Sequence, residues 1–561
     1  MIVFYALFYG LLLCFSRFSG VNAATTVPLF ELLKNPAFYP GDMYVHGSVM
    51  SQTTLMYPLL KMFGPAAASE YFIFLIYLIA SLAHIYFIYK IAETIFPKLK
   101  EYNIGLIAVL MFLYDNPIFS GSYPQLVSQH SFRQTVLTMP FIGAGIYYYL
   151  KNKPMAALFI LSACAMPLHF RSCWVFVAIS LVYLFFFYEK RSLKNIFLSC
   201  LLVLIGLAIL FSYRNASGIG QLDFSQRLQL CRIVVERWGD EGSPFLNSWI
   251  DFARLLTVLL PAAIYIYFLK DRGYRLRLYI FYATALAFFL VGGLYAAYFY
   301  QYFPYLEIFS LGFPQIPSYL IIISVVLIAG MLLEYATNDT RALFRRRLCV
   351  AGLFIVAYLP NLKLKSIPIY LAAILITYLL IYRNKSIALK MRLRPITAWI
   401  FAAIILFLGV KNTERIMQSY QSKAPCFPFV VFNFEKASYD CQVWAAANTV
   451  PDSVFLAFRG GGSALNFDDF FRKYSHRTMF FGDVANIVYN AELAQEHLRR
   501  QDFIKKLSDL IIAGEGEQAY RLIRSASGRI DYVVLPKGMR LACAQVYTND
   551  GYIIYKVSAG S

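Results

Sequence analysis

Charged residues are scarce in this sequence, and their scarcity excludes most water-soluble folds. Asp, Glu, Lys and Arg make up 15% of the 561 residues, whereas hydrophobic residues make up 59%. A soluble globular domain carries roughly 25% charged residues. We therefore expect the chain to be solvated largely by lipid, and the aromatic content of 17% suits residues that lie at the two membrane interfaces.

Local motifs for metal, redox or nucleotide chemistry are also missing. The nine cysteines include no Cys-x-x-Cys pair. Gly460-Gly461-Gly462 lacks the Lys-Ser/Thr of a phosphate loop, so we interpret it as a flexible loop after a strand. An exported C-terminal domain would allow a disulfide among Cys426, Cys441 and Cys543, and the sequence does not choose the pair. The net charge of +20 does not indicate nucleic acid binding, because much of the basic charge lies in short loops between apolar runs.

Apolar runs long enough, or nearly long enough, to cross a bilayer recur along the first 410 residues. We expect about thirteen spans, near 2–18, 70–94, 104–122, 136–150, 154–168, 172–188, 195–212, 250–269, 277–300, 318–334, 347–360, 366–382 and 396–410. The loops between them are alternately rich and poor in Lys and Arg, which mark the cytoplasmic side. This alternation predicts a cytoplasmic N-terminus and an extracytoplasmic C-terminal part. The first run is either a retained helix, which we favour, or a cleavable signal peptide.

Two long segments on the outer side, 20–69 and 213–249, distinguish the chain from a plain helical bundle. The first predicts a short helix at 27–33, a turn at Pro40-Gly41 and a second short helix at 53–62. The segment around Glu236, Asp240 and Glu241 is most simply a solvated helix face. Outer segments of this size commonly carry function rather than only connecting helices.

From about residue 411 the composition becomes that of a water-soluble domain, which we expect to span 411–561. Strands are predicted at 453–458, 478–481, 530–535 and 552–557, and amphipathic helices at 491–512 and 515–524. Asn549-Asp550-Gly551 predicts a hairpin turn. The fold class is thus a multi-spanning α-helical membrane protein with a small extracytoplasmic α/β domain.

Two acids are candidate catalytic residues. Asp42 follows the first short helix on the outer face, where a carboxylate is suited to accept a proton from an acceptor hydroxyl or to hold a divalent metal. The alternative is that Asp42 only caps a turn. Asp115 lies at membrane depth, where an acid usually faces a cavity or a partner. Its alternative is an ion pair with a neighbouring helix.

Basic residues at the outer helix ends are candidates for binding phosphate. Arg171 and His169 occupy the tip of a tight helical hairpin, and the guanidinium of Arg171 is suited to a phosphate or pyrophosphate unless it simply reaches the interface. His130, Arg133 and Arg254 are weaker substrate-binding candidates.

Three short segments carry a resemblance to a known family: 35–42, 444–456 and 471–477. Together with the layout of helices, first outer loop and outer domain, they resemble a poorly characterised bacterial branch of the GT-C superfamily of membrane glycosyltransferases. The resemblance implies that Asp42 takes the role of the first-loop catalytic acid and places Asp115 loosely at a second acidic motif. The chain departs from the family pattern, because it has no paired Asp-x-Asp or Glu-x-Asp and no Trp-Trp-Asp signature.

The resemblance also implies an activity and its partners. The expected reaction transfers a sugar from a polyprenyl-phosphate-linked donor to an acceptor on the outer face of the bacterial inner membrane, with a divalent metal such as Mg²⁺ or Mn²⁺ as a possible cofactor. Membrane lipid and the polyprenyl-linked donor are the expected partners, and the sequence indicates no nucleic acid and specifies no protein partner. Two alternatives stay open: a non-catalytic envelope assembly protein, and a transporter of lipid or polysaccharide.

Overall fold

A computed structural model describes much of the helical part and most of the C-terminal domain. The described residues are 27–46, 60–64, 69–102, 104, 134–189, 192–214, 222–240, 249–269, 271–309, 311, 313, 316–337, 426–427, 430–431, 436–461, 464–467, 471–482, 491–526 and 529–557.

Long helices form the first part, and every expected apolar run within the described residues is helical. These helices are α5 (Glu70–Ile95), α8 (Gln134–Leu150), a rod made of α9 (Pro154–Phe159), the π-helical turn η3 (Ile160–Ala165) and α10 (Met166–Leu168), then α11 (Phe170–Phe186), α12 (Leu193–Arg214), α14 (Trp249–Phe268), α15 (Arg272–Ala297) and α17 (Ile316–Thr337). The runs near 2–18, 104–122, 347–360, 366–382 and 396–410 lie outside the described residues, residue 104 apart.

Only α5 and α15 are long and apolar enough, among the described helices, to cross a membrane by their own length and composition. The described residues therefore do not support the expected count of thirteen spans. For α8 and α11 the shortfall is one of length, because they have 17 residues each. Such a helix measures about 26 Å, less than the roughly 30 Å of a bilayer core.

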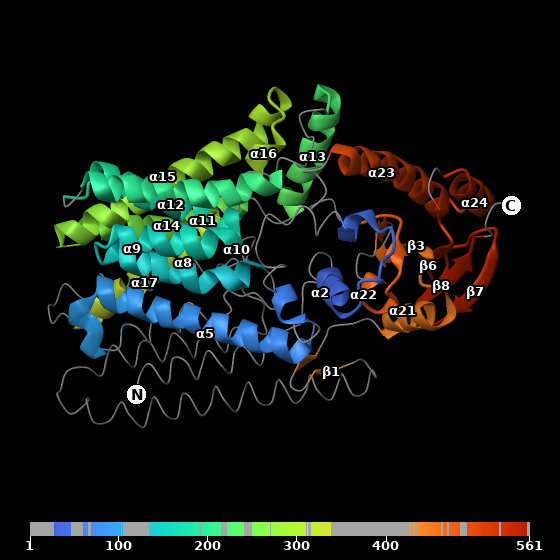
Figure 1. Cartoon of the computed structure of the whole chain (residues 1–561), viewed down its shortest axis with the longest axis horizontal. Helices are drawn as coiled ribbons and strands as arrows, with labels where there is room; N and C mark the ends of the chain where they lie inside the picture. The colour runs from blue at the N-terminus through green and yellow to red at the C-terminus, as the bar shows by residue number, and fades with distance from the viewer. Residues whose placement is uncertain are drawn as a thin grey trace.

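The long helices pack side by side, with α5 against α8, α14 against α17 and α11 against α15 (Figure 1). Many large apolar side chains also stand on their outer surface, including Phe197, Ile264 and Val291, each at least 60% exposed. A helix that is apolar on its outer face as well as its inner one is typical of a protein core or a membrane span.

Shorter elements connect the long helices. They are α2 (Val27–Lys34), the 3₁₀-helices η2 (Pro97–Tyr102) and η5 (Phe299–Gln301), α13 (Phe224–Asp240) and α16 (Leu306–Phe309). The helix expected at 27–33 is confirmed by α2. The second helix expected in the first loop lies largely outside the described residues, and α13 occupies the middle of the second outer segment.

The C-terminal domain is built on a mixed sheet with the strand order β4-β3-β6-β8-β7, and β5 also pairs with β3. Its elements are α21 (Lys436–Asn448), β3 (Val454–Gly461), β4 (Ala464–Phe467), α22 (Arg472–Ser475), β5 (Thr478–Met479), α23 (Ala491–Ile512), α24 (Gly516–Arg524), β6 (Tyr532–Pro536), β7 (Ala544–Thr548) and β8 (Tyr552–Lys556). Strand β3 runs parallel to β5 and β6, and the other pairs are antiparallel. A separate two-stranded ladder joins β1 (Cys426–Phe427) and β2 (Val430–Val431).

Both faces of the central strands are buried, because alternate side chains point into two cores. Phe455 and Ala457 of β3 pack with Cys441 and Ala445 of α21. Leu456 and Phe458 face the other way and share a core with α23 and α24. The domain is therefore a three-layer α/β/α unit, with α21 on one side of the sheet and α23 and α24 on the other (Figure 1).

Several element predictions are confirmed, and two need correction. Helix α23 has the predicted bounds, and β3, β5, β6 and β8 occupy the predicted strands within three residues at either end. Gly460 and Gly461 are not in a flexible loop: they extend β3 and pair with Leu465 and Ala464 of β4. Cys441 and Cys543 are both free thiols, so a disulfide between them is excluded.

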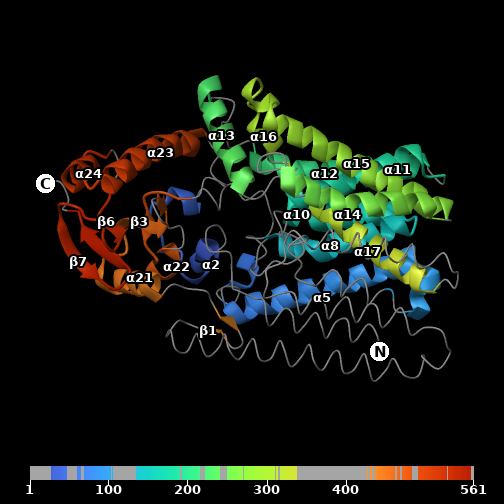
Figure 2. The same ribbon diagram turned by 180° about the vertical axis from the view of Figure 1, so that it is seen from behind.

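The helical part and the C-terminal domain meet at two places. Helix α2 lies beside α22, and the amino-terminal half of α23 reaches α13, as both views show (Figures 1 and 2). The hydrophobic core of the helical part continues into this half of α23 through Ala491, Ala494 and Leu498. At the second contact Gln495 donates a hydrogen bond to Gln226 of α13.

Candidate functional site at the junction of the first loop and the C-terminal domain

Asp42 is placed by a compact turn that follows α2. The Asn35 side chain accepts a hydrogen bond from the Ala37 amide, and the Asp42 amide donates to the carbonyl of Tyr39. The turn requires left-handed backbone at two positions, where Tyr39 has a φ of 57° and Gly41 a φ of 74°. Glycine adopts this conformation without steric cost, which explains Gly41.

The carboxylate of Asp42 then caps the helical residues 43–46. Its Oδ1 accepts hydrogen bonds from the amides of Tyr44 and Val45, at 3.0 and 3.2 Å. Amides at these positions have no carbonyl partner within their own helical turn, so an Asp at the cap satisfies them. The turn-capping interpretation of Asp42 is therefore correct for its local contacts.

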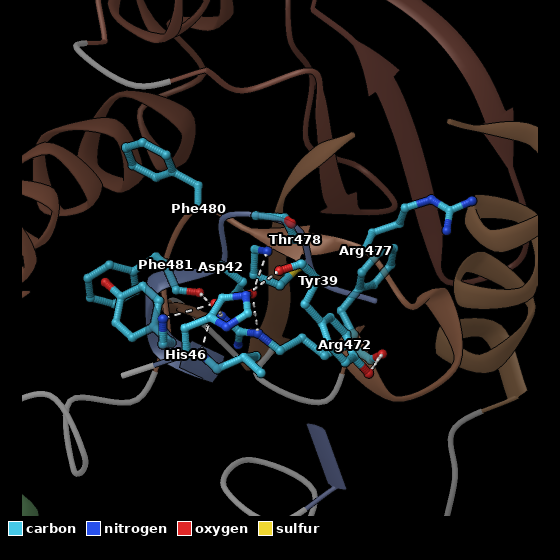
Figure 3. A network of polar contacts seen from close by, with 12 residues as sticks. Tyr39, Asp42, His46, Arg472, Arg477, Thr478, Phe480 and Phe481 are labelled. Atoms are coloured by element: carbon cyan, nitrogen blue, oxygen red, sulfur yellow. Dashed lines mark hydrogen bonds and ion pairs between the residues drawn. The ribbon is translucent and has the colours of Figure 1, made fainter. Parts of the chain in front are cut away.

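Arg472 of the C-terminal domain completes the surroundings of this carboxylate (Figure 3). Its Nε donates to Oδ2 of Asp42 at 2.8 Å and its Nη2 to Oδ1 at 3.3 Å. The amide of Met479 donates to Oδ2 at 2.9 Å. The side chain of Asp42 is 0% exposed and that of Arg472 is 2% exposed, so the two charges are paired away from the protein surface.

Asp42 thus accepts five hydrogen bonds, two from the guanidinium and three from backbone amides. A carboxylate offers about four lone-pair sites, so none is left for an acceptor hydroxyl. A divalent metal does not fit either, because both oxygens already bind the cation of Arg472. No group of three or more His, Cys, Asp or Glu residues suited to a metal ion occurs in the described part of the chain.

Two further hydrogen bonds hold the first loop on the domain. The hydroxyl of Tyr39 donates to the carbonyl of Arg472 at 3.1 Å, and the hydroxyl of Thr478 donates to the carbonyl of Pro40 at 2.8 Å. Burial raises the pKa of Tyr39 well above its usual value, so the hydroxyl stays protonated and keeps donating. His46 also contacts the turn, with its Nε2 3.1 Å from the carbonyl oxygen of Tyr39.

At the rim of the junction, His476 is bound by two residues of the first loop. Its ring stacks on Phe38 with 4.3 Å between the ring centroids, and its Nε2 lies 3.4 Å from the carboxylate of Glu31. Burial raises the pKa of Glu31, but the hydrogen bonds with His476 and Lys34 outweigh burial and leave this pKa below its ordinary value. Glu31 is therefore held in its charged form.

On the other side, Tyr44 joins the junction to α23. Its hydroxyl lies 3.1 Å from Nδ1 of His497, whose ring stacks on Phe481. The guanidinium of Arg472 is 5.6 Å from the centre of the Tyr44 ring. Gly482 leaves the room for this arrangement, because a Cβ there would lie 2.8 Å from Nη2 of Arg472 and 2.9 Å from Cγ of Tyr44.

Arg477 lies in the same segment as Arg472 but binds different partners. Its side chain points away from Asp42 (Figure 3). It donates to the carbonyls of Ala446 and Thr449 at the end of α21, at 2.8 and 2.7 Å. Burial lowers the pKa of Arg477. This arginine caps a helix of the domain and takes no part in the junction.

The other predicted site residues are not brought to Asp42 by the described structure. Asp115, His130 and Arg133 lie outside the described residues. His169 is half-buried at the start of α11, Arg171 lies in the first turn of the same helix, and Arg254 lies in α14. The predicted convergence of Asp42, Asp115 and Arg171 on one cavity stays a prediction.

The residues that the sequence analysis did not assign to the site are Arg472, Thr478, Met479 and His497. The one signal for Arg472 was its place in the segment 471–477, which carries part of the resemblance. No spacing rule links it to Asp42, because the two are 430 residues apart in the chain. The two segments 35–42 and 471–477 nevertheless meet in space.

No protein-family model matches the chain, and comparison with curated proteins found no match.

Proposed function

We propose that this chain is a membrane-embedded glycosyltransferase of the GT-C kind, which takes a sugar from a polyprenyl-phosphate-linked donor and acts on the extracytoplasmic face. One observation carries the proposal: two of the three segments on which the resemblance rests, 35–42 and 471–477, contact each other directly. Segments that are 430 residues apart and form one junction behave as parts of a single site rather than as chance similarities.

Insertion in a membrane is supported by the surface of the helical part. Large apolar side chains such as Phe197 and Val291 point outward from the bundle. In water such a surface would be an aggregation liability, whereas in a bilayer it is solvated by lipid tails. Within this proposal the expected thirteen spans place the first loop, α13 and the C-terminal domain outside the cell membrane.

Asp42 takes a positioning role in this proposal, not that of a base. A carboxylate with five donors would have to give up Arg472 or a backbone amide before it accepted a proton. Phosphate binding then falls to Arg171 with His169, and His130, Arg133 and Arg254 are further substrate contacts in the proposal. Asp115 is the acid left for proton transfer.

The activity is tested with the full-length chain in liposomes that contain a panel of polyprenyl-phosphate sugars. We expect release of polyprenyl phosphate that depends on the chain. Arg171→Gln should reduce turnover at least tenfold, since a charge-assisted phosphate contact is worth about 1.5–3 kcal/mol. Arg232→Gln is the matched control, because Arg232 is exposed on α13, and it should leave turnover unchanged. Equal effects of the two substitutions, or no turnover of any donor, would contradict the proposal.

The role of Asp42 is tested by a paired substitution in the same assay. Asp42→Asn leaves Arg472 buried without a charge partner and should abolish turnover by opening the junction. Asp42→Asn combined with Arg472→Gln replaces the ion pair with two neutral amides and should restore much of the turnover. A combined variant that folds yet stays inactive would return Asp42 to the role of base.

A second candidate is a non-catalytic envelope assembly protein, and the saturated carboxylate of Asp42 favours it. A junction whose central acid has no free lone pair resembles a structural joint. In this case the full-length chain would turn over no donor and would co-purify with an envelope protein in a fixed ratio. Arg472→Ala would release that partner.

A further inference from the structure

Arg277 is a buried cation at the end of the bundle that lies away from the junction. It belongs to the second turn of α15, whose other end leads into η5; η5 contacts α13, and α13 contacts α23. Its side chain is 8% exposed and its Nε has no hydrogen-bond partner. No acid in the described part of the chain lies within ion-pair distance of it, in contrast to Arg472.

The neighbours of Arg277 leave its charge unbalanced. The Tyr274 ring lies 4.6 Å from Cζ of the guanidinium, and the Tyr149 hydroxyl donates to the backbone carbonyl of Arg277, not to its side chain. Lys151, at the end of α8, lies within electrostatic reach of Tyr274 and adds a second positive charge. A buried charge without a counter-charge is strongly unfavourable, so an anion is the expected missing partner.

The first turn of α15 lies against the guanidinium at an exposed glycine. Gly273 is exposed, and a Cβ built on it would lie 3.2 Å from Oδ1 of Asp271, 3.5 Å from Nη1 of Arg277 and 3.8 Å from its Nη2. The amides of Tyr274 and Arg275 are bonded to Asp271, whereas those of Arg272 and Gly273 have no carbonyl partner within the helix. The amino end of a helix also carries partial positive charge, which attracts anions.

Asp271 is the one described acid at this turn, and it opposes an anion. Its Oδ1 is held by the Tyr274 amide at 3.0 Å and borders the same position beside Gly273 as the guanidinium, 3.2 Å from where a Gly273 Cβ would lie. Against it stand Arg277, Lys151 and the exposed Arg272, so positive charge prevails at the open face.

We infer that a phosphate group binds at the start of α15, where its oxygens accept hydrogen bonds from the Arg277 guanidinium and the Gly273 amide. Lys151 and Arg272 supply further positive charge. The ligand is a phosphate monoanion or diester, either the headgroup of a phospholipid or free phosphate. This site is separate from the junction and does not rest on the proposed transferase activity.

The test uses the full-length chain in detergent micelles. Native mass spectrometry counts the phosphatidylglycerol molecules that stay bound, and inorganic phosphate is then added as a competitor. The wild-type chain should retain a lipid that Arg277→Gln binds about tenfold more weakly, the usual loss for a hydrogen bond to a charged group. Arg232→Gln removes the same charge from an exposed position on α13, outside the proposed site, and should change binding less than twofold.

Gly273→Ala provides a second variant in case Arg277→Gln does not fold. Its added methyl group fills the space over the guanidinium while alanine favours the helix, so binding should weaken with the fold intact. Competition by millimolar phosphate would identify free phosphate as the ligand, and its absence would identify the headgroup. Equal binding by all four proteins, or binding by none, would overturn the inference.

Discussion

The junction and the far end of the helical bundle each bury an arginine, and the two arginines differ in what surrounds them. Arg472 donates to both oxygens of Asp42 and to the carbonyl of Phe481. Arg277 has an aromatic ring, a nearby lysine and no carboxylate within ion-pair distance among the described residues. A buried cation that is fully matched within the chain indicates a structural joint, whereas an unmatched one indicates a ligand.

The largest expected effect comes from breaking the matched pair. Arg472→Ala leaves the carboxylate of Asp42 buried without its cation and should destabilise the junction by about 3–5 kcal/mol. The measurement is hydrogen exchange of the amides in residues 472–482 of the full-length chain. Arg521→Ala removes the exposed pair with Glu517 in the same domain and should change stability by less than about 0.5 kcal/mol. Similar losses of stability in both variants would mean that the buried ion pair stabilises the protein no more than an exposed one.

The space around the pair is the next most sensitive feature. Gly482→Ala places a methyl group against Arg472 and the Tyr44 ring, and overpacking of this kind costs about 1–3 kcal/mol. Exchange of the 472–482 amides should accelerate accordingly. Unchanged exchange would show that the arginine and the ring move aside freely.

Removal of a single hydroxyl at the junction should cost less stability than the two substitutions above. Tyr39→Phe removes the hydrogen bond to the carbonyl of Arg472 and should cost about 1 kcal/mol of junction stability. Tyr555 makes a bond of the same 3.1 Å length to the carbonyl of Met539 inside the domain. Tyr555→Phe should therefore weaken the domain by a similar amount without opening the junction first, and thermal unfolding separates the two effects.

The smallest effect is a dependence on pH through Glu31. The hydrogen bonds from His476 and Lys34 lower the pKa of Glu31 in the folded state below the unfolded value of 4.5. The stability that this acid contributes is present above pH 4.5 and is lost as the pH falls through the folded pKa. Glu31→Gln should remove about 0.5 kcal/mol at pH 7 and flatten this part of the acid dependence. Glu517→Gln, at an exposed pair, is the control.

The periodic elements of the fold were predictable from the sequence because their patterns are strong. Helix α23 alternates charged and apolar residues at helical spacing, and β3, β6 and β8 are rich in apolar residues with turn signals at their ends. Strand β7 was missed because its side chains are mostly exposed at the sheet edge. Helix α21 was missed because its apolar residues form no continuous stripe.

The candidate site was predictable only in part. Proline, glycine and aspartate at 40–42 predict a turn that is capped by the aspartate. The capping role of Asp42 is confirmed by its hydrogen bonds with the amides of Tyr44 and Val45. The pairing with Arg472 was out of reach, because it depends on a contact across 430 residues that no local pattern encodes. The prediction of a loop at Gly460 and Gly461 was wrong for a related reason. Their place in a strand is fixed by pairing with β4, not by the conformational preference of glycine.

A double-substitution cycle tests most directly whether Asp42 and Arg472 form one structural unit. Asp42→Ala, Arg472→Ala and the combined variant are compared by exchange of the Phe480 amide, which is bonded to the carbonyl of Phe455 and to neither substituted residue. The coupled pair predicts a combined loss smaller than the sum of the single losses by about 2 kcal/mol or more. Losses that add to within about 0.5 kcal/mol would show that the two charges act independently and would contradict the account.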